Sequence, residues 1–150
     1  MNLTGKGQHI DDIKNQLDLL DVNIDPDCKQ WLATNLRGSF DDKIKTLILG
    51  VADSFLAGGK AQTSIAAAAS EAGYDIIFNL QGAYFSSPTI GGLKNDFTIL
   101  IHELAHLFNA PGFNNNDGEM DKNGNLTQAA EDAQKHNQDL IEEHCANTIH

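Results

Sequence analysis

The chain has 150 residues, with 21 acidic against 10 basic side chains and a formal net charge of −11. This balance argues against a nucleic-acid-binding protein, which needs a basic face, and no apolar run approaches the ~20 residues that span a bilayer. The first residues also lack the charged and apolar regions of a signal peptide. A hydrophobic content of 41% at this length predicts one folded domain over residues 1–150.

The first third of the chain is expected to be helical. Apolar residues recur at helical spacing between His9 and Leu20. Asp25 followed by Pro26 is typical of a helix start, because aspartate caps the helix and proline fits its first turn. A third helix is expected from about residue 39 to residue 56, where two glycines follow.

The middle of the chain is expected to supply a small sheet. Residues 62–71 are rich in alanine and leave the choice between helix and strand open, with alanine favouring a helix. Residues 75–80 give the strongest strand pattern, and residues 83–87 are expected to form a second short strand after a Gln-Gly turn.

Helices return in the last third. Asn95 or Asp96 is expected to cap a strongly apolar helix that runs to Asn109. A polar loop over residues 114–125 then leads to a last helix over residues 127–148. The order of these elements predicts an α+β fold.

The apolar helix contains His102-Glu103-Leu104-Ala105-His106. Two histidines four residues apart lie on one helix face, so both imidazoles can bind one metal ion at about 2.0–2.1 Å. Glu103 points about 100° away around the helix, where it can take a proton from water activated by the metal. The pattern predicts a zinc-dependent hydrolase. Two structural histidines are the competing interpretation, although a buried, unpaired Glu103 would be costly.

A catalytic zinc site needs a third protein ligand and one open position. A further histidine does not follow the motif, because Asn109 and Gly112 occupy the positions where a glycine and a histidine would continue it. Asp117 is the first carboxylate after the motif, and the intervening Pro-Gly break and Asn-rich loop can bring it back to the metal. The other candidates are Glu119, Asp121, Glu131, Asp132 and His136.

Residues 119–126 also resemble part of a calcium-binding loop, with Gly124 at the expected spacing. Ala130 stands where such a loop has a bidentate glutamate. A calcium-stabilised structural domain is therefore an alternative that depends on this loop alone.

The two cysteines, Cys28 and Cys145, are not spaced as a zinc-binding or redox pair. They can form a disulfide or remain two separate buried thiols. A disulfide would tie the N-terminal region to the last helix and stabilise the fold by about 4–5 kcal/mol in the chain-entropy model.

The segment from Phe97 to His106, followed by Pro111-Gly112 and Asp117, resembles the zincin-like metallopeptidases. It is most similar to bacterial putative metallopeptidase domains also found at the ends of RHS-repeat proteins. The resemblance extends over most of the chain, and its flanking parts are Cys28, Trp31, Leu32, residues 137–141 and Cys145.

This resemblance implies a small twisted sheet packed on a buried active-site helix, with N-terminal and C-terminal helices around it. The similarity to aspzincins implies zinc held by His102, His106 and Asp117, although the Gly-Thr-x-Asp sequence of true aspzincins is absent. The paired cysteines of the group favour the Cys28–Cys145 disulfide.

The resemblance also implies a peptide or protein substrate and a secreted or cell-surface location. In zincins, a strand at the sheet edge holds an extended substrate by β-augmentation, and residues 83–87 are the expected counterpart. Tyr84 then lies near the cleft or covers the core as an edge aromatic. The alternative function is a non-catalytic metal-binding or interaction module of a larger surface or secreted protein.

Overall fold

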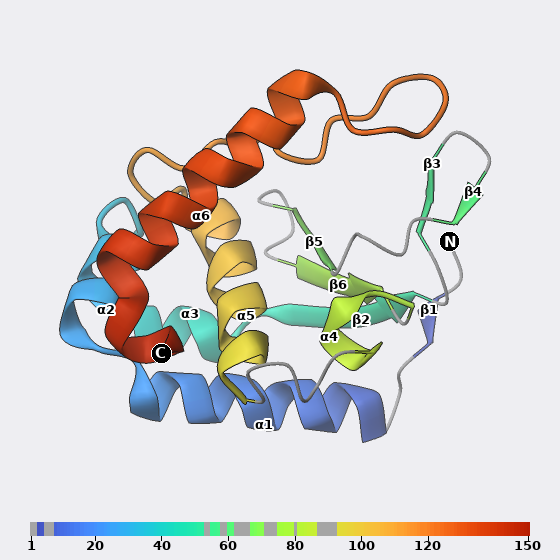
Figure 1. Ribbon diagram of the computed structural model, residues 1–150. Coiled ribbons are helices and arrows are strands. Elements are labelled where there is room, and N and C mark those ends of the chain that lie inside the picture. The colour runs from blue at the N-terminus through green and yellow to red at the C-terminus, as the bar shows by residue number, and fades with distance from the viewer. Residues whose placement is uncertain are drawn as a thin grey trace.

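The computed structural model has a mixed α+β architecture, in which helices pack around a small sheet (Figure 1). The expected fold class is therefore confirmed at the level of α+β. The structure describes residues 3–4, 8–52, 55–57, 60–61, 67–70, 75–79, 81–86 and 93–150.

The two expected N-terminal helices are confirmed. Helix α1 spans Gln8–Asn23 and buries the apolar stripe read from the sequence. Helix α2 spans Pro26–Ala33, and the Asp25 carboxylate caps it by accepting a hydrogen bond from the Cys28 backbone N–H at 3.0 Å. The local signals of periodicity and capping were sufficient here.

The prediction of one helix over residues 39–56 is wrong. Helix α3 spans only Phe40–Lys45, and the chain then forms strand β2 over Ile48–Ala52. The apolar run that begins at Leu47 fits a buried strand as well as a buried helix, so its spacing alone could not decide. Gly50, which disfavours a helix interior, was the contrary signal. The glycines expected to end this helix, residues 58–59, lie outside the described residues.

The main sheet has the order β1-β2-β6-β5. Strand β2 runs parallel to β6 (Asp75–Asn79), whereas β1 (Leu3–Thr4) and β5 (Ala67–Ser70) are antiparallel to their neighbours. The strand expected over residues 75–80 is thus confirmed as β6. The described end of the ambiguous alanine-rich segment forms the edge strand β5. A separate hairpin pairs β3 (Leu56–Ala57) with β4 (Lys60–Ala61).

The second strand expected over residues 83–87 is also wrong, because Ala83–Ser86 form the short helix α4. Residue 87 lies outside the described residues. Tyr84 is 5% exposed and packs on Phe78 of β6, with 4.8 Å between ring centroids. A segment this short cannot reveal its period, and burial of adjacent aromatic residues against the core accounts for the helical turn.

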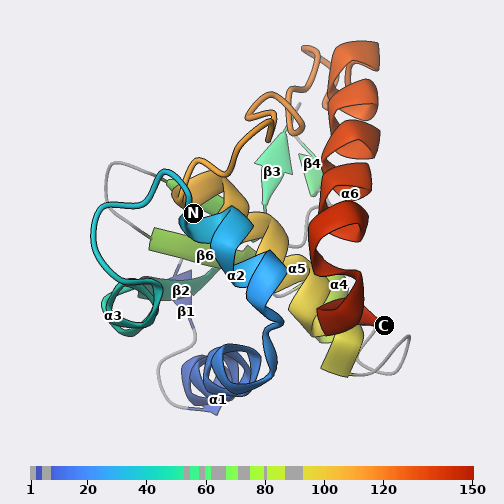
Figure 2. The same ribbon diagram turned by 90° about the vertical axis from the view of Figure 1, so that its left-hand side faces the viewer.

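Helix α5 (Leu93–Leu107) lies at the centre of the molecule and contacts α1, α6 and β5 (Figures 1 and 2). It begins slightly before the expected cap at residues 95–96. Asn109 ends the helix with φ of 51°, and the Ala110 N–H donates to Ala105 O at 3.0 Å. This is a Schellman ending with asparagine in the left-handed position, and it turns the chain sharply after the His102–His106 segment.

The last helix, α6, spans Gln128–Ile149, and Thr127 caps it by accepting from the Ala130 N–H at 3.1 Å. The disulfide between Cys28 and Cys145 is confirmed and joins α6 to α2. Thr148 adds a second connection, because its Oγ1 donates to Asp25 Oδ2 at 2.6 Å. The C-terminal half of α6 is therefore fixed to the N-terminal part of the chain.

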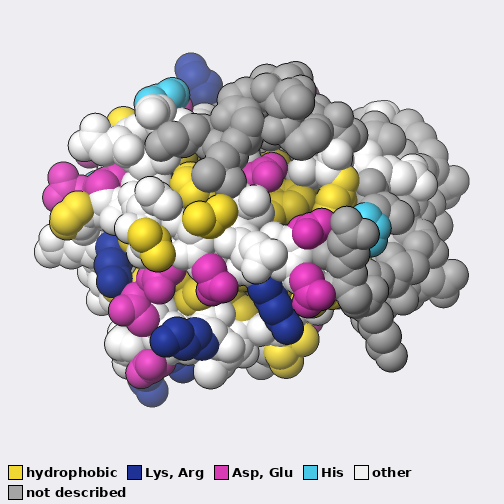
Figure 3. All heavy atoms as spheres, turned by 90° about the horizontal axis from the view of Figure 1, so that it is seen from below, with side chains coloured by type: hydrophobic (Ala, Val, Ile, Leu, Met, Phe, Trp, Pro, Cys, Tyr) yellow, Lys and Arg dark blue, Asp and Glu magenta, His cyan; other side chains and the backbone are white. Residues whose placement is uncertain are grey.

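The outer face formed around α1 carries acidic and basic side chains interspersed with apolar ones (Figure 3). A broad basic area is not visible among the described residues of this face. Within the described part of the chain, none of the helices combines the length and apolar character that a membrane crossing requires.

Candidate metal centre

Helix α5 presents His102 and His106 on one side, as their spacing predicts. The opposite faces of this helix are apolar, and Leu100, Ile101 and Leu104 are completely buried. The histidines are therefore left on the side that meets the loop after the helix. Their Nε2 atoms lie 3.2 Å apart, so both point toward the same small volume.

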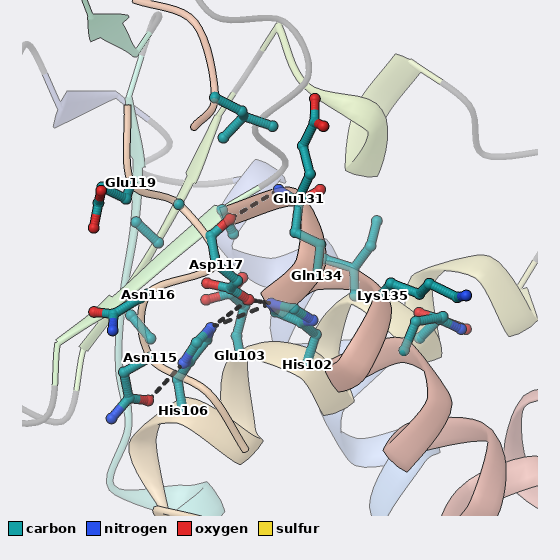
Figure 4. Close-up of a pocket in the computed structure, with 18 of the residues that line it drawn as sticks. His102, Glu103, His106, Asn115, Asn116, Asp117, Glu119, Glu131, Gln134 and Lys135 are labelled. Carbon is teal, nitrogen blue, oxygen red and sulfur yellow. Dashed lines mark hydrogen bonds and ion pairs between the residues drawn. The ribbon is translucent and has the colours of Figure 1, made fainter. Parts of the chain in front are cut away.

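The loop after α5 brings Asp117 to the two histidines (Figure 4). Asp117 Oδ2 lies 2.8 Å from His102 Nε2 and 3.1 Å from His106 Nε2. The reversal begins at Asn109 and continues through Gly112, which has φ of 80°. The candidate ligand atoms of the three side chains all lie within 4.8 Å of one another, so this group can hold a metal ion.

Neighbouring side chains fix the orientation of His106. Its Nδ1 lies 3.0 Å from Asn115 Oδ1. Because an amide oxygen only accepts, the Nδ1–H donates to it, and Nε2 is the ring nitrogen that faces Asp117 and His102. Phe113 packs edge-on against both imidazoles, with ring centroids 4.8 Å from His106 and 5.1 Å from His102.

Helix α6 holds Asp117 from the other side. Asn137 Nδ2 donates to Asp117 Oδ2 at 3.0 Å, and Gln134 Nε2 donates to the Asp117 carbonyl at 2.9 Å. Sequence reasoning gave neither residue a role at the site. Their polar character within a helix was a weak signal, because exposed helices commonly carry such residues.

Burial and hydrogen bonding oppose each other in the electrostatics of the site. Burial raises the pKa of Asp117, but hydrogen bonds from His102 and His106 outweigh it and hold that pKa well below its usual range. Burial lowers the pKa of His106, yet the hydrogen bonds to Asp117 and Asn115 leave it raised overall. The Asp117 carboxylate, which faces both imidazoles, is therefore already placed to interact with a positive charge.

Glu103 is 6% exposed, and burial raises its pKa despite the opposing effect of the two histidines. It follows His102 directly on α5 and lines the same cavity as both histidines. A buried carboxyl group with a raised pKa is a stronger base than an exposed one, which suits proton transfer at this position.

His102, His106 and Asp117 line a cleft of about 1190 Å³. One wall comes from β5 and is formed by the small side chains of Ala67, Ala68 and Ala69, and the other comes from α6 and the loop around Asp117 (Figure 4). The edge strand next to the cleft is therefore β5 and not the expected segment 83–87. Tyr84 does not line this cleft but a smaller cavity next to Asp96.

The other candidate ligands are engaged elsewhere or lie outside the group. Asp121 Oδ1 accepts from the backbone N–H groups of Asn123 and Asn125 at 2.8 and 3.1 Å, which closes its own loop. His136 Nε2 lies 2.7 Å from Gly112 O, Asp132 accepts from Gln128, and Glu119 and Glu131 line the cleft wall. Among the described residues, the only cluster suited to a metal ion is that of His102, His106 and Asp117.

Comparison with protein-family models, with curated proteins and with solved structures finds no match to this chain. The residues of the site are therefore the basis on which a function can be assigned.

Proposed function

We propose that this protein is a zinc-dependent metallopeptidase of zincin-like architecture, with His102, His106 and Asp117 as the metal ligands. The supporting observation is that Asp117, from a separate loop, meets the two motif histidines in an open cleft. Two imidazoles and one carboxylate form a donor set typical of catalytic zinc, which keeps a fourth position open. The orientation of His106 also fits this role, because Asn115 holds Nδ1 and leaves Nε2 facing the other two proposed ligands.

When bound, zinc supplies a Lewis acid that polarises a carbonyl and acidifies water. Glu103 is the proposed general base: it accepts a proton from the attacking water and then passes it to the leaving amine. Between these two steps Glu103 holds the proton. Its burial on α5 and the raised pKa that results favour this protonated form of the side chain. Asp117 and the histidines hold the metal and do not take part in the proton transfer.

The edge strand β5 supports a peptide as the substrate. It is last in the sheet order, so its outer edge is without a strand partner among the described residues. An extended peptide can pair with such an edge by main-chain hydrogen bonds, and the alanine side chains of β5 leave space beside the metal centre. We therefore assign to residues 67–70 the substrate-binding role that segment 83–87 was expected to have.

The disulfide is compatible with an oxidising compartment, and a secreted or cell-surface location is part of the proposal. Metal content is the first test. Protein purified without added metal is expected to contain one equivalent of zinc by elemental analysis. His106→Ala should lose the zinc, whereas Glu103→Gln should keep it because Glu103 is not a ligand.

Peptide hydrolysis is the second test, measured on an unfolded fluorescently labelled protein. Glu103→Gln is expected to lower the rate by about 100-fold or more, the usual size of a general-base contribution. Glu143→Gln, a carboxyl-to-amide change at a side chain that is 69% exposed on α6, is the matched control. Bound zinc together with an unchanged rate in Glu103→Gln would exclude the proposed mechanism, and zinc without any hydrolysis would identify a non-catalytic metal-binding module.

A further inference from the structure

Asn137 is a polar residue in the completely buried face of α6, with 0% of its surface exposed. Burying an amide is costly unless its atoms find hydrogen-bond partners. Each partner of Asn137 lies in the loop that carries Asp117. This residue therefore connects α6 to the loop and not to the rest of the core.

The hydrogen bonds of Asn137 determine which way its amide faces. Oδ1 accepts from the Asn114 backbone N–H at 2.7 Å, while Nδ2 donates to the Asn114 carbonyl at 2.8 Å. The reverse orientation would place donor against donor and acceptor against acceptor. The second hydrogen of Nδ2 is consequently directed to Asp117 Oδ2, 3.0 Å away.

Gln134 lies one helical turn before Asn137 on the same face of α6. Its Nε2 donates to the Asp117 carbonyl at 2.9 Å (Figure 4). The two amides thus restrain both the backbone and the carboxylate of Asp117. Helix α6 is itself held by the disulfide at Cys145, which makes it a fixed support for the loop.

We infer that Asn137 is a positioning residue that orients the Asp117 carboxylate toward the two histidines. This role rests on the metal centre proposed above. The Nδ2–H stabilises the charged carboxylate and limits its rotation, so that Asp117 is already placed when the metal arrives. Partners of this kind behind a ligand typically contribute 10–100-fold to metal affinity.

The inference can be tested by zinc competition titration of the full chain against a chromophoric chelator. Asn137→Asp keeps the size of the side chain but replaces the N–H with a second carboxylate oxygen facing Asp117. Asn137→Ala removes the contact altogether. Both variants are expected to bind zinc at least 10-fold more weakly than the unmodified chain. Asn147→Asp and Asn147→Ala, at an exposed position of the same helix, should stay within twofold.

Cobalt substitution separates positioning from a general structural effect. The visible absorption of bound Co²⁺ reports the arrangement of its ligands, so it is expected to change in whichever Asn137 variant keeps the circular dichroism of the folded chain. A folded variant with unchanged zinc affinity and an unchanged Co²⁺ spectrum would overturn the inference. If the unmodified chain bound neither metal, the proposed function and this inference would both fail. If it bound zinc without cleaving peptides, only the proposed catalysis would fail.

Discussion

Reduction of the Cys28–Cys145 disulfide should remove a large part of the stability of this domain. The two cysteines are 117 residues apart in the chain. In the chain-entropy model, closing a loop of that length costs the unfolded state about 16 cal/mol/K, or about 5 kcal/mol at 25 °C. A domain of this size commonly has only about 5–15 kcal/mol of stability, so the reduced protein should be close to unfolding.

Urea unfolding followed by far-ultraviolet circular dichroism measures this loss with and without a reducing agent. The fluorescence of Trp31 supplies a local probe, because this tryptophan packs on Phe113 and His144 close to the disulfide. The Cys28→Ala/Cys145→Ala variant is the control, since reducing agent should leave its stability unchanged. A reduced protein within about 1 kcal/mol of the oxidised one would refute the reasoning, because the cross-link would then not restrict the unfolded chain.

Three further outcomes are expected. Burial raises the pKa of Asp96 to about 6, so the free energy of unfolding should fall as the pH rises from about 4 to about 6. Asp96→Asn should weaken this dependence and gain about 1 kcal/mol at pH 7, a value reduced for partial exposure, as measured by urea unfolding at about pH 4 and about pH 7. Asn109→Ala should cost about 1 kcal/mol in the same assay, because alanine disfavours a φ of 51°, while Asn147→Ala should cost little. Zinc at 100 times its dissociation constant should stabilise the chain by about 2.7 kcal/mol, seen as a higher melting temperature that His106→Ala abolishes.

The helices could be predicted from sequence where local signals agreed. Asp25 and Thr127 occupy cap positions in the structure, and α5 carries an apolar pattern interrupted on one side by the two histidines. Strand β2 could not be predicted with the same rules, because a short apolar run has no period that separates a strand from a helix. Its conformation is decided by pairing with β6, a segment more than twenty residues away.

The candidate site shows the same division between local and distant information. Helix geometry alone places His102 and His106 together. Asp117 could be favoured as the nearest following carboxylate, but the choice among six candidates required knowledge of where the loop goes. Asn137 was not identifiable as a partner of Asp117, because its hydrogen bonds depend on how α6 packs against the loop.

The proposed third ligand is therefore the part of the site that depends most on the whole fold. Trp31 of α2 donates to the Pro111 carbonyl at 3.1 Å and contacts Phe113, which packs on both histidines. From the opposite end of the chain, α6 holds Asp117 and is joined to α2 by the disulfide. The helix supplies two candidate ligands by its own geometry, whereas the position of the third depends on contacts between the first and last parts of the chain. A change that disturbs the packing of α2 against α6 should therefore displace Asp117 more than it displaces His102 and His106.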